Sequence, residues 1–288
     1  MKDRSMRLTV SNHSFEYLNL EGTLALAKAM GFTGVDIAGF HNRGRCSLEP
    51  DEVAADPVGH ADRLNELLEQ YGLDAVDFFP QFGASLYERC FNSPDPTVRL
   101  QNMESFKGIT NFCKLANIPG FTISPGIHHP DRSMEENMDT SGDALGILTD
   151  IAGEQGINVR FEPHLSSVAD TPERALALLE RAPDAKLTLD YSHFTLQYIS
   201  EDRIHPLLPF TDHFHIRSAR PGKLQTRLDE NTIDFIEIAD RLNSLDYQRC
   251  LSIEYVYMSW FDCNQVDCLT ETIFTKDLLE PHVSVNWE

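Results

Sequence analysis

Three carboxylates stand at the ends of short apolar segments that are rich in β-forming residues. Glu162, Asp190 and Glu254 each terminate a segment of this kind. A buried carboxylate is costly unless it is paired with a positive group or bound to a cation. Three carboxylates that converge on one place would repel one another without a positive charge between them. We therefore interpret the three residues as ligands of a divalent metal ion.

A histidine supplies a fourth candidate ligand. His215 lies on the same face of its segment as Arg217, because side chains alternate with a period of two along a strand. A neutral imidazole can bind a metal ion. Three oxygens and one nitrogen suit Mn²⁺, which we expect first, with Mg²⁺, Co²⁺ or Zn²⁺ as alternatives. A single such residue is as often a helix cap or an ion-pair partner, so the interpretation depends on all four together.

The elements that must position these residues alternate along the chain. Apolar segments rich in β-formers recur, and nearly all of them are followed by a segment with helical spacing. The strand candidates are residues 8–10, 34–37, 74–79, 120–124, 158–161, 186–189, 213–217 and 251–255. The helix candidates are residues 20–30, 57–71, 97–116, 138–155, 172–181 and 233–245. The sixth crossover, near residues 200–208, is short and kept irregular by prolines.

Long crossovers between consecutive strands predict a parallel sheet with right-handed connections. Eight such units in 288 residues predict an α/β protein with a single (β/α)8 TIM barrel. We assign residues 1–288 to one domain, because no Gly/Ser-rich or Pro-rich linker divides the chain. The tail after about residue 260 is expected to pack over the barrel as an extension.

Histidines gather at one end of this expected barrel. Of the 11 histidines, seven fall at or just past the end of a predicted strand: His13, His41, His128, His129, His164, His193 and His215. Chemistry in this fold lies at the C-terminal ends of the strands. Histidines on one rim favour a ligand or proton-transfer site over a scattered surface population. His60, His205, His213 and His282 do not follow this pattern.

Composition excludes several classes of function. The chain has 24 Lys and Arg against 45 Asp and Glu, a formal net charge of −21, which opposes binding to nucleic acid. No apolar run approaches the roughly 18 residues of a membrane span, so no membrane partner is expected. The start lacks the apolar core of a secretory signal, which predicts a cytoplasmic protein. Six cysteines without a Cys-x-x-Cys pair read as reduced thiols.

The constellation resembles a known family. Glu162, the Asp-Tyr-Ser-His stretch at 190–193, the His215-x-Arg217 pair and Glu254 are similar to the sugar isomerase/epimerase superfamily with a xylose-isomerase-like barrel. This superfamily includes ketose 3-epimerases, inosose dehydratases and endonuclease IV. Residues 24–37 also resemble the family's first helix and second strand, and the resemblance covers nearly the whole chain.

The resemblance implies roles for particular residues. Glu162, Asp190, His215 and Glu254 would be the metal ligands. His193 and Arg217 would contact substrate oxygens, although an ion pair of Arg217 with a ligand is an equal alternative. His13 and His164 are further candidates for substrate binding. The implied partner is a small carbohydrate, and the implied assembly is a homodimer or homotetramer.

The chain departs from parts of this superfamily. Ketose 3-epimerases carry a carboxylate six residues beyond the position of Glu162, and this chain has Val168 there. Arg217 replaces the usual Lys, and Ser218 follows it where an Asp is common. These differences argue against a ketose 3-epimerase. Residues 227–231 read Arg-Leu-Asp-Glu-Asn and lack the Asp-x-His that endonuclease IV carries among its additional metal ligands, which argues with the acidic charge against DNA repair.

The expected chemistry is proton transfer next to a carbonyl. A divalent ion bound by a carbonyl and a neighbouring hydroxyl acidifies the adjacent C–H bond, and Glu162 and Glu254 would serve as general base and acid. Return of the proton to the other face epimerises a sugar, and transfer to the next carbon isomerises it. A leaving group in the β position would instead give a lyase, either a dehydratase or a glycoside β-eliminase, acting on a keto-sugar or keto-inositol. A non-catalytic sugar-binding barrel is the remaining alternative, which the four intact ligand positions disfavour.

Overall fold

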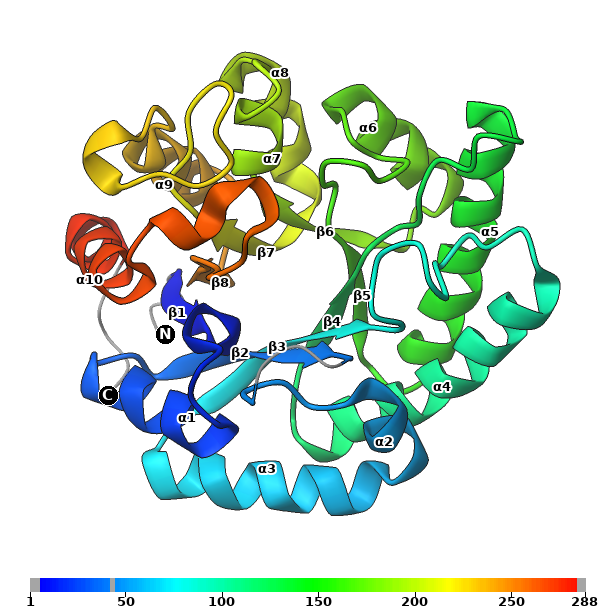
Figure 1. The fold of residues 1–288 in the computed structure, drawn as a ribbon, viewed down its shortest axis with the longest axis horizontal. Helices are drawn as coiled ribbons and strands as arrows, with labels where there is room; N and C mark the ends of the chain where they lie inside the picture. The colour runs from blue at the N-terminus through cyan, green and yellow to red at the C-terminus, as the bar shows by residue number, and fades with distance from the viewer. Residues whose placement is uncertain (1–5, 42–44, 284–288) are drawn as a thin grey trace.

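Eight parallel strands close into a barrel in the order of the sequence (Figure 1). The computed structural model describes residues 6–41 and 45–283. The strands are β1 (Arg7–Ser11), β2 (Gly34–Phe40), β3 (Asp74–Gln81), β4 (Gly120–Ile123), β5 (Asn158–Phe161), β6 (Lys186–Asp190), β7 (Thr211–Ile216) and β8 (Cys250–Ile253). β1 pairs with β8 as well as with β2, which closes the ring. The predicted (β/α)8 barrel is confirmed.

Helices surround the barrel (Figure 1). They are α1 (Leu20–Ala29), α2 (Pro50–Ala55), α3 (Pro57–Tyr71), α4 (Pro96–Leu115), α5 (Met134–Gly153), α6 (Pro172–Arg181), α7 (Ser192–Thr195), α8 (Glu201–Ile204), α9 (Phe235–Ser244) and α10 (Cys268–Leu279). Local sequence sets their ends: Ser133 and Glu136 form a capping box at the start of α5. The sixth crossover consists of α7, α8 and the 3-10 helix η2 (His205–Phe210), which contains Pro209. It is short and irregular, as predicted.

The last segment of the described chain forms a helix on the barrel wall. After β8 comes the 3-10 helix η4 (Trp260–Gln265), and α10 then packs against β1 and β8, beside the N-terminal part of the barrel (Figure 1). Its buried face carries polar residues: Thr275 Oγ1 lies 2.9 Å from Tyr255 Oη, and Glu271 Oε2 accepts the backbone N–H of Leu228 at 2.7 Å. The tail thus occupies the position of the helix that follows β8.

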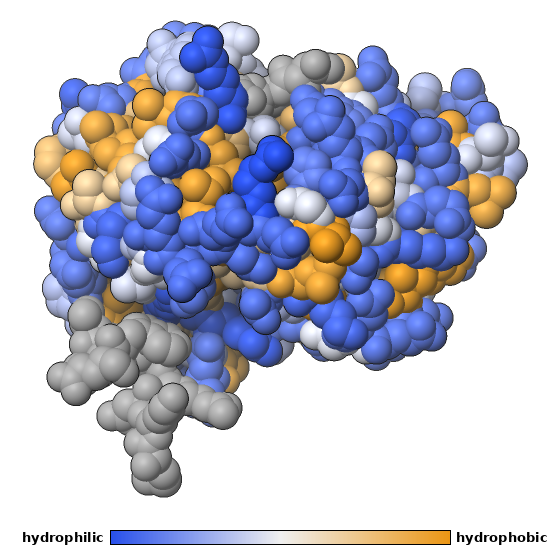
Figure 2. Space-filling model, turned by 90° about the horizontal axis from the view of Figure 1, so that it is seen from below, coloured by the Kyte–Doolittle hydropathy of each residue, from blue (hydrophilic) through white to orange (hydrophobic). Residues whose placement is uncertain are grey.

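The two faces of the strands carry side chains of different polarity. Outward-facing side chains pack against the helices, as where Phe78 of β3 meets Phe112 of α4 with ring centroids 5.1 Å apart. Inward-facing residues are largely polar, and Thr122 and Thr188 are hydrogen-bonded across the barrel at 2.6 Å. The outer surface shown in Figure 2 is mostly hydrophilic, with hydrophobic residues in separate patches. Among the described residues, no helix is both long and apolar enough to cross a bilayer.

A compact ion-pair cluster fills the barrel towards the N-terminal ends of the strands. Arg160 Nη1 lies 2.7 Å from Asp77 Oδ1, and Arg160 Nε lies 2.8 Å from Asp212 Oδ2. Arg249 Nε approaches the other oxygen of Asp212 at 3.0 Å. We call these four residues the base cluster. Its two guanidinium groups, of which that of Arg249 is half exposed, balance its two carboxylates, so the cluster has no surplus of either sign.

Candidate active site

A second buried cluster lies at the opposite end of the barrel. Glu162 directly follows β5, Asp190 ends β6, His215 lies in β7, Arg217 follows β7 and Glu254 follows β8. All five side chains are buried. They meet because the C-terminal ends of parallel strands share one end of a barrel. We call these five residues the mouth cluster.

The four predicted ligands share one location. His215 Nδ1 lies 2.8 Å from Glu162 Oε1 and 3.2 Å from Glu254 Oε2. The ligand atoms of Glu162, His215 and Glu254 all lie within 4.8 Å of one another, and so do those of Glu162, Asp190 and His193. Glu162 belongs to both groups and therefore connects Asp190 to the other ligands.

Arg217 forms an ion pair with one of these ligands. Its Nη2 contacts Asp190 Oδ2, and its Nε donates to Ser192 Oγ at 3.1 Å. Burial by itself raises the pKa of Asp190, but Arg217 and then His193 lower it overall. Burial likewise opposes the charge of Arg217, yet Asp190 and then Glu254 raise its pKa. Both groups therefore stay charged, and Arg217 compensates one carboxylate of the cluster.

The charges and donor atoms of the mouth cluster fit a divalent cation. When His215 is neutral, as a metal ligand must be, three carboxylates and one guanidinium leave two negative charges, which one divalent ion would neutralise. Burial lowers the pKa of His215, but Glu254, Asp36 and Glu162 together raise it well above its usual value. The cluster thus draws positive charge to the place between its carboxylates. Three carboxylates and an imidazole are ligand types that Mn²⁺, Mg²⁺, Co²⁺ and Zn²⁺ accept.

A cavity of ≈ 290 Å³ opens over the cluster. Glu162, Arg217 and Glu254 form part of its wall, with His13, His164 and His193 beside them. The other wall residues are Phe40, Phe79, Gln81, Ser85, Leu86, Tyr87, Val256, Met258 and Trp260. A concave site with a few convergent polar groups and an apolar wall is typical of small-molecule binding.

The predicted rim histidines divide into two groups. His13 packs edge-on against Phe40 with centroids 4.8 Å apart, and the rings of His164 and His193 lie 5.5 Å apart, all at the cavity. His41 instead accepts a hydrogen bond from the backbone of Gly83 at 2.6 Å. His128 is exposed, and His129 Nε2 lies 3.5 Å from Cys90 Sγ. Only part of the rim therefore belongs to one site.

The sequence did not point to several residues of this region. Gln81, the last residue of β3, lines the cavity, and its place at a strand end was the available signal. Asp36 of β2 and His213 of β7 face the barrel interior beneath His215. Burial by itself raises the pKa of Asp36, but His213 and then His215 lower it well below its usual range. Their inward orientation follows from strand alternation, whereas their contact depends on barrel closure.

Comparisons with known proteins agree with this architecture. A family model described as "Xylose isomerase-like TIM barrel" matches residues 24–273. The inosose dehydratase of Geobacillus thermodenitrificans (strain NG80-2) is 27% identical over 106 residues, which cover 36% of this chain and 35% of that protein. The alignment thus spans only about a third of that relative's length.

Solved structures match over nearly the full chain. The apo form of 3-keto-D-glucoside 4-epimerase from E. coli has a TM-score of 0.71 at 16% identity, covering 94% of this chain and 99% of that one. The IOLI protein with a bound zinc atom has a TM-score of 0.74 at 18% identity, covering 97% of this chain and 100% of that one. At such identities the likeness shows a shared fold.

Proposed function

The chain belongs to the xylose isomerase-like TIM barrel family, and we propose that it is a divalent-metal-dependent enzyme that isomerises or epimerises a sugar. The observation that carries the proposal is the mouth cluster, where three carboxylates outnumber the single guanidinium beneath a cavity of ≈ 290 Å³ and so favour a bound cation. The proposed metal ligands are Glu162, Asp190, His215 and Glu254. A bound divalent ion would supply Lewis acidity to a carbonyl and hydroxyl of the substrate.

Glu162 and Glu254 are the proposed proton-transfer groups. Both line the cavity, and both face His215 Nδ1. One carboxylate takes the proton from the carbon next to the carbonyl, and the other returns a proton. Return to the opposite face of the same carbon gives the epimer, and delivery to the neighbouring carbon gives the isomer.

His193 and Arg217 are proposed to hold substrate oxygens. Burial holds the pKa of His193 well below its usual value, although Asp190 opposes this shift, so its ring is neutral near pH 7. A neutral ring can donate from one nitrogen and accept at the other. Arg217 stays charged and presents a planar guanidinium, which fixes the direction of its hydrogen bonds. His13 and His164 lie at the same cavity and are proposed as further substrate contacts.

Cofactor and partners follow from the same argument. We propose Mn²⁺ as the working ion, with Mg²⁺, Co²⁺ and Zn²⁺ as alternatives for a site of three oxygens and one nitrogen. A small carbohydrate is the proposed partner, and neither nucleic acid nor membrane is expected from the charge of −21 and the apolar pattern. A cytoplasmic homodimer or homotetramer is proposed for the assembly.

A lyase is the second candidate. Val168 is fully buried. The resemblance to ketose 3-epimerases implies a further carboxylate at this position, so that part of their pattern is missing. The matched segment of an inosose dehydratase favours the same alternative. If the substrate carries a leaving group β to the abstracted proton, the same carboxylates would lead to elimination.

A ¹H NMR assay in D₂O tests the proposal. The metal-loaded protein is incubated with ketoses, inososes and 3-keto-glycosides, and the signals next to the carbonyl are followed, with chelator-treated protein as the control. Exchange with a rearranged sugar is expected. Exchange with an unsaturated product would establish the lyase instead. No exchange with any of these compounds, despite bound metal, would contradict both and favour a binding protein.

A further inference from the structure

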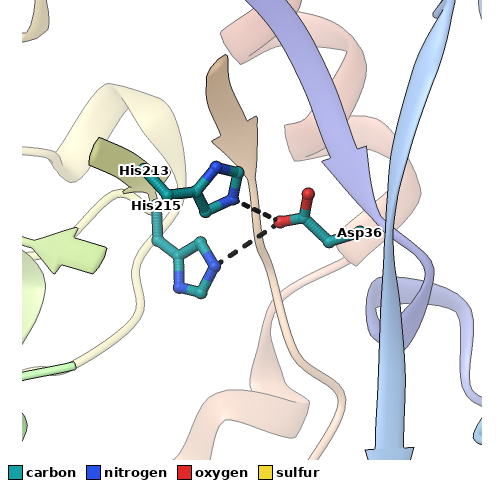
Figure 3. Close-up of side chains that lie close together, drawn as sticks. All are labelled: Asp36, His213 and His215. Carbon is teal, nitrogen blue, oxygen red and sulfur yellow. Dashed lines mark hydrogen bonds and ion pairs between the residues drawn. The ribbon is translucent and has the colours of Figure 1, made fainter. Parts of the chain in front are cut away.

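Two buried residues contact the face of His215 that points away from the glutamates. Asp36 on β2 and His213 on β7 lie beside His215 (Figure 3). His213 Nε2 lies 2.9 Å from Asp36 Oδ2, and His215 Nε2 lies 3.5 Å from the same oxygen. The three side chains are at most 5% exposed. The three side chains therefore contact one another inside the barrel, away from solvent.

The two nitrogens of His215 face different partners. Nδ1 is directed at Glu162 and Glu254. Nε2 is directed at Asp36 (Figure 3). A nitrogen that binds a metal ion must present a lone pair, so a neutral imidazole then carries its proton on the other nitrogen. Nε2 has no hydrogen-bond partner among the described residues, and Asp36 Oδ2 lies 3.5 Å from it. Asp36 is thus the acceptor available to that proton.

We propose that Asp36 is a positioning residue of the metal site, which accepts the Nε2 proton of His215 and thereby turns Nδ1 towards the cation. His213 holds the carboxylate of Asp36 in place through its own contact with Oδ2. Such partners of metal-binding histidines fix the ring orientation and the tautomer, and their loss typically costs 10- to 100-fold in metal affinity. The inference rests on the metal site of the proposed function.

A second metal ion is the competing explanation of this contact. Ligand atoms of Asp36, His213 and His215 lie within 4.8 Å of one another. However, Asp36 brings one negative charge, so a divalent ion there would leave a buried positive charge without compensation. Asp77, another carboxylate of the interior, is paired with Arg160. The charges therefore favour a hydrogen bond over a second cation.

Asp36→Asn is the test, because it removes the charge and keeps the size of the side chain. We expect the dissociation constant for Mn²⁺, measured against a competing chelator, to rise roughly 10- to 100-fold. The visible spectrum of the Co²⁺ form should change, since the histidine no longer has a fixed orientation. The stoichiometry should stay at one ion per chain. His213→Gln leaves Asp36 in place and should give a smaller rise, and it serves if Asp36→Asn fails to fold.

Asp77→Asn is the matched control. It makes the same chemical change in the same interior, but its carboxylate faces Arg160. We expect it to lower the melting temperature and leave the Mn²⁺ dissociation constant unchanged. An equal loss of affinity in both Asn variants, or no loss in Asp36→Asn, would overturn the inference while the metal site stands. Two ions in the wild type and one in Asp36→Asn would make Asp36 a ligand. A wild type that binds no Mn²⁺ or Co²⁺ would overturn the proposed function as well.

Discussion

The base cluster and the mouth cluster bury charges in one barrel and differ in how those charges are balanced. In the base cluster, Arg160 lies between Asp77 and Asp212, and Arg249 contacts the second oxygen of Asp212. The mouth cluster has three carboxylates, and its only guanidinium, that of Arg217, is paired with Asp190. The base cluster therefore needs no ligand, whereas the mouth cluster has the excess of carboxylates from which we propose a bound cation.

This difference separates residues that serve the fold from residues that serve chemistry. A balanced buried cluster with good geometry is complete when the chain folds, and removing one member leaves a charge without its partner. In an unbalanced cluster beside a cavity, repulsion between the buried like charges raises the free energy of the folded state until an oppositely charged ligand binds. Perturbations at the base should therefore change stability, and perturbations at the mouth should change metal binding and turnover.

Replacing a mouth carboxylate should have the largest effect. In Glu162→Gln we expect a loss of turnover of about 10⁴-fold, because the residue is both a proposed ligand and a proposed proton-transfer group. The melting temperature of the metal-free protein should change little, because the variant removes one of three neighbouring negative charges but also a charged partner of His215. The exchange assay and a thermal melt measure the two effects.

His205→Asn provides the control for this variant. His205 is bonded through Nδ1 to Tyr191 Oη at 2.8 Å, away from the cavity, and its loss should leave turnover unchanged. Unchanged turnover in Glu162→Gln would remove Glu162 from the mechanism. It would also contradict the assignment of catalysis to the mouth cluster.

Replacing the central cation of the base cluster should have the next largest effect. Arg160→Met leaves Asp77 and Asp212 without their shared partner, and we expect the free energy of unfolding to fall by about 3–5 kcal/mol. The Mn²⁺ dissociation constant should not change. Urea denaturation and chelator competition measure the two quantities.

Arg249→Met is the matched control, because the Arg249 side chain is 52% exposed. Its effect should be below about 1 kcal/mol, as for other exposed ion pairs. A change in metal affinity in Arg160→Met as large as that in Glu162→Gln would show that the two clusters act as one.

The sequence predicted most residues of the mouth cluster, but not the contacts of Asp36 and His213 beneath it. Glu162, Asp190 and Glu254 could be grouped because each ends an apolar strand, and the C-terminal ends of parallel strands meet. The pairing of Asp36 with His213 joins residues 177 positions apart. Their proximity depends on barrel closure and on how far each side chain reaches inward, which strand alternation alone does not specify.

Secondary structure shows the same limit. α3 and α6 have the predicted bounds, because their apolar stripes and capping residues mark them. α10 was not predicted as a helix, since its buried face carries Glu271, Thr272 and Thr275. Those groups are buried against polar partners such as Tyr255. The buried face of α10 therefore lacks the helical spacing of apolar residues from which other helices were predicted.

Removing the metal ion should have a smaller effect that is specific to the mouth. An ion present at 100 times its dissociation constant stabilises the folded state by about 2.7 kcal/mol. Chelation should therefore lower the melting temperature of both the wild type and Arg160→Met. The loss in unfolding free energy should be the same in the two proteins. Glu162→Gln should respond much less. Equal sensitivity of all three proteins to the chelator would mean that the stabilising ion binds elsewhere.

The change in stability that pH produces through Asp212 of the base cluster should be the smallest of these effects. Burial by itself raises the pKa of Asp212, but Arg160 and then Arg249 lower it overall. A lowered pKa in the folded state gives stability that is present above the unfolded value of about 3.9 and is lost as the pH falls through the folded value. In Asp212→Asn, Asp77 still pairs with Arg160, so we expect a loss of only about 1.5 kcal/mol at pH 7.

The gap in unfolding free energy between the wild type and Asp212→Asn should therefore close as the pH falls below about 3.9, the unfolded-state pKa of Asp. Urea denaturation of the metal-free proteins at several pH values measures this gap. A gap that stays constant down to pH 3 would mean that Asp212 contributes through shape and hydrogen bonding rather than through charge. The base cluster would then be a packing feature, and charge balance would no longer explain why it needs no ligand when the mouth cluster does.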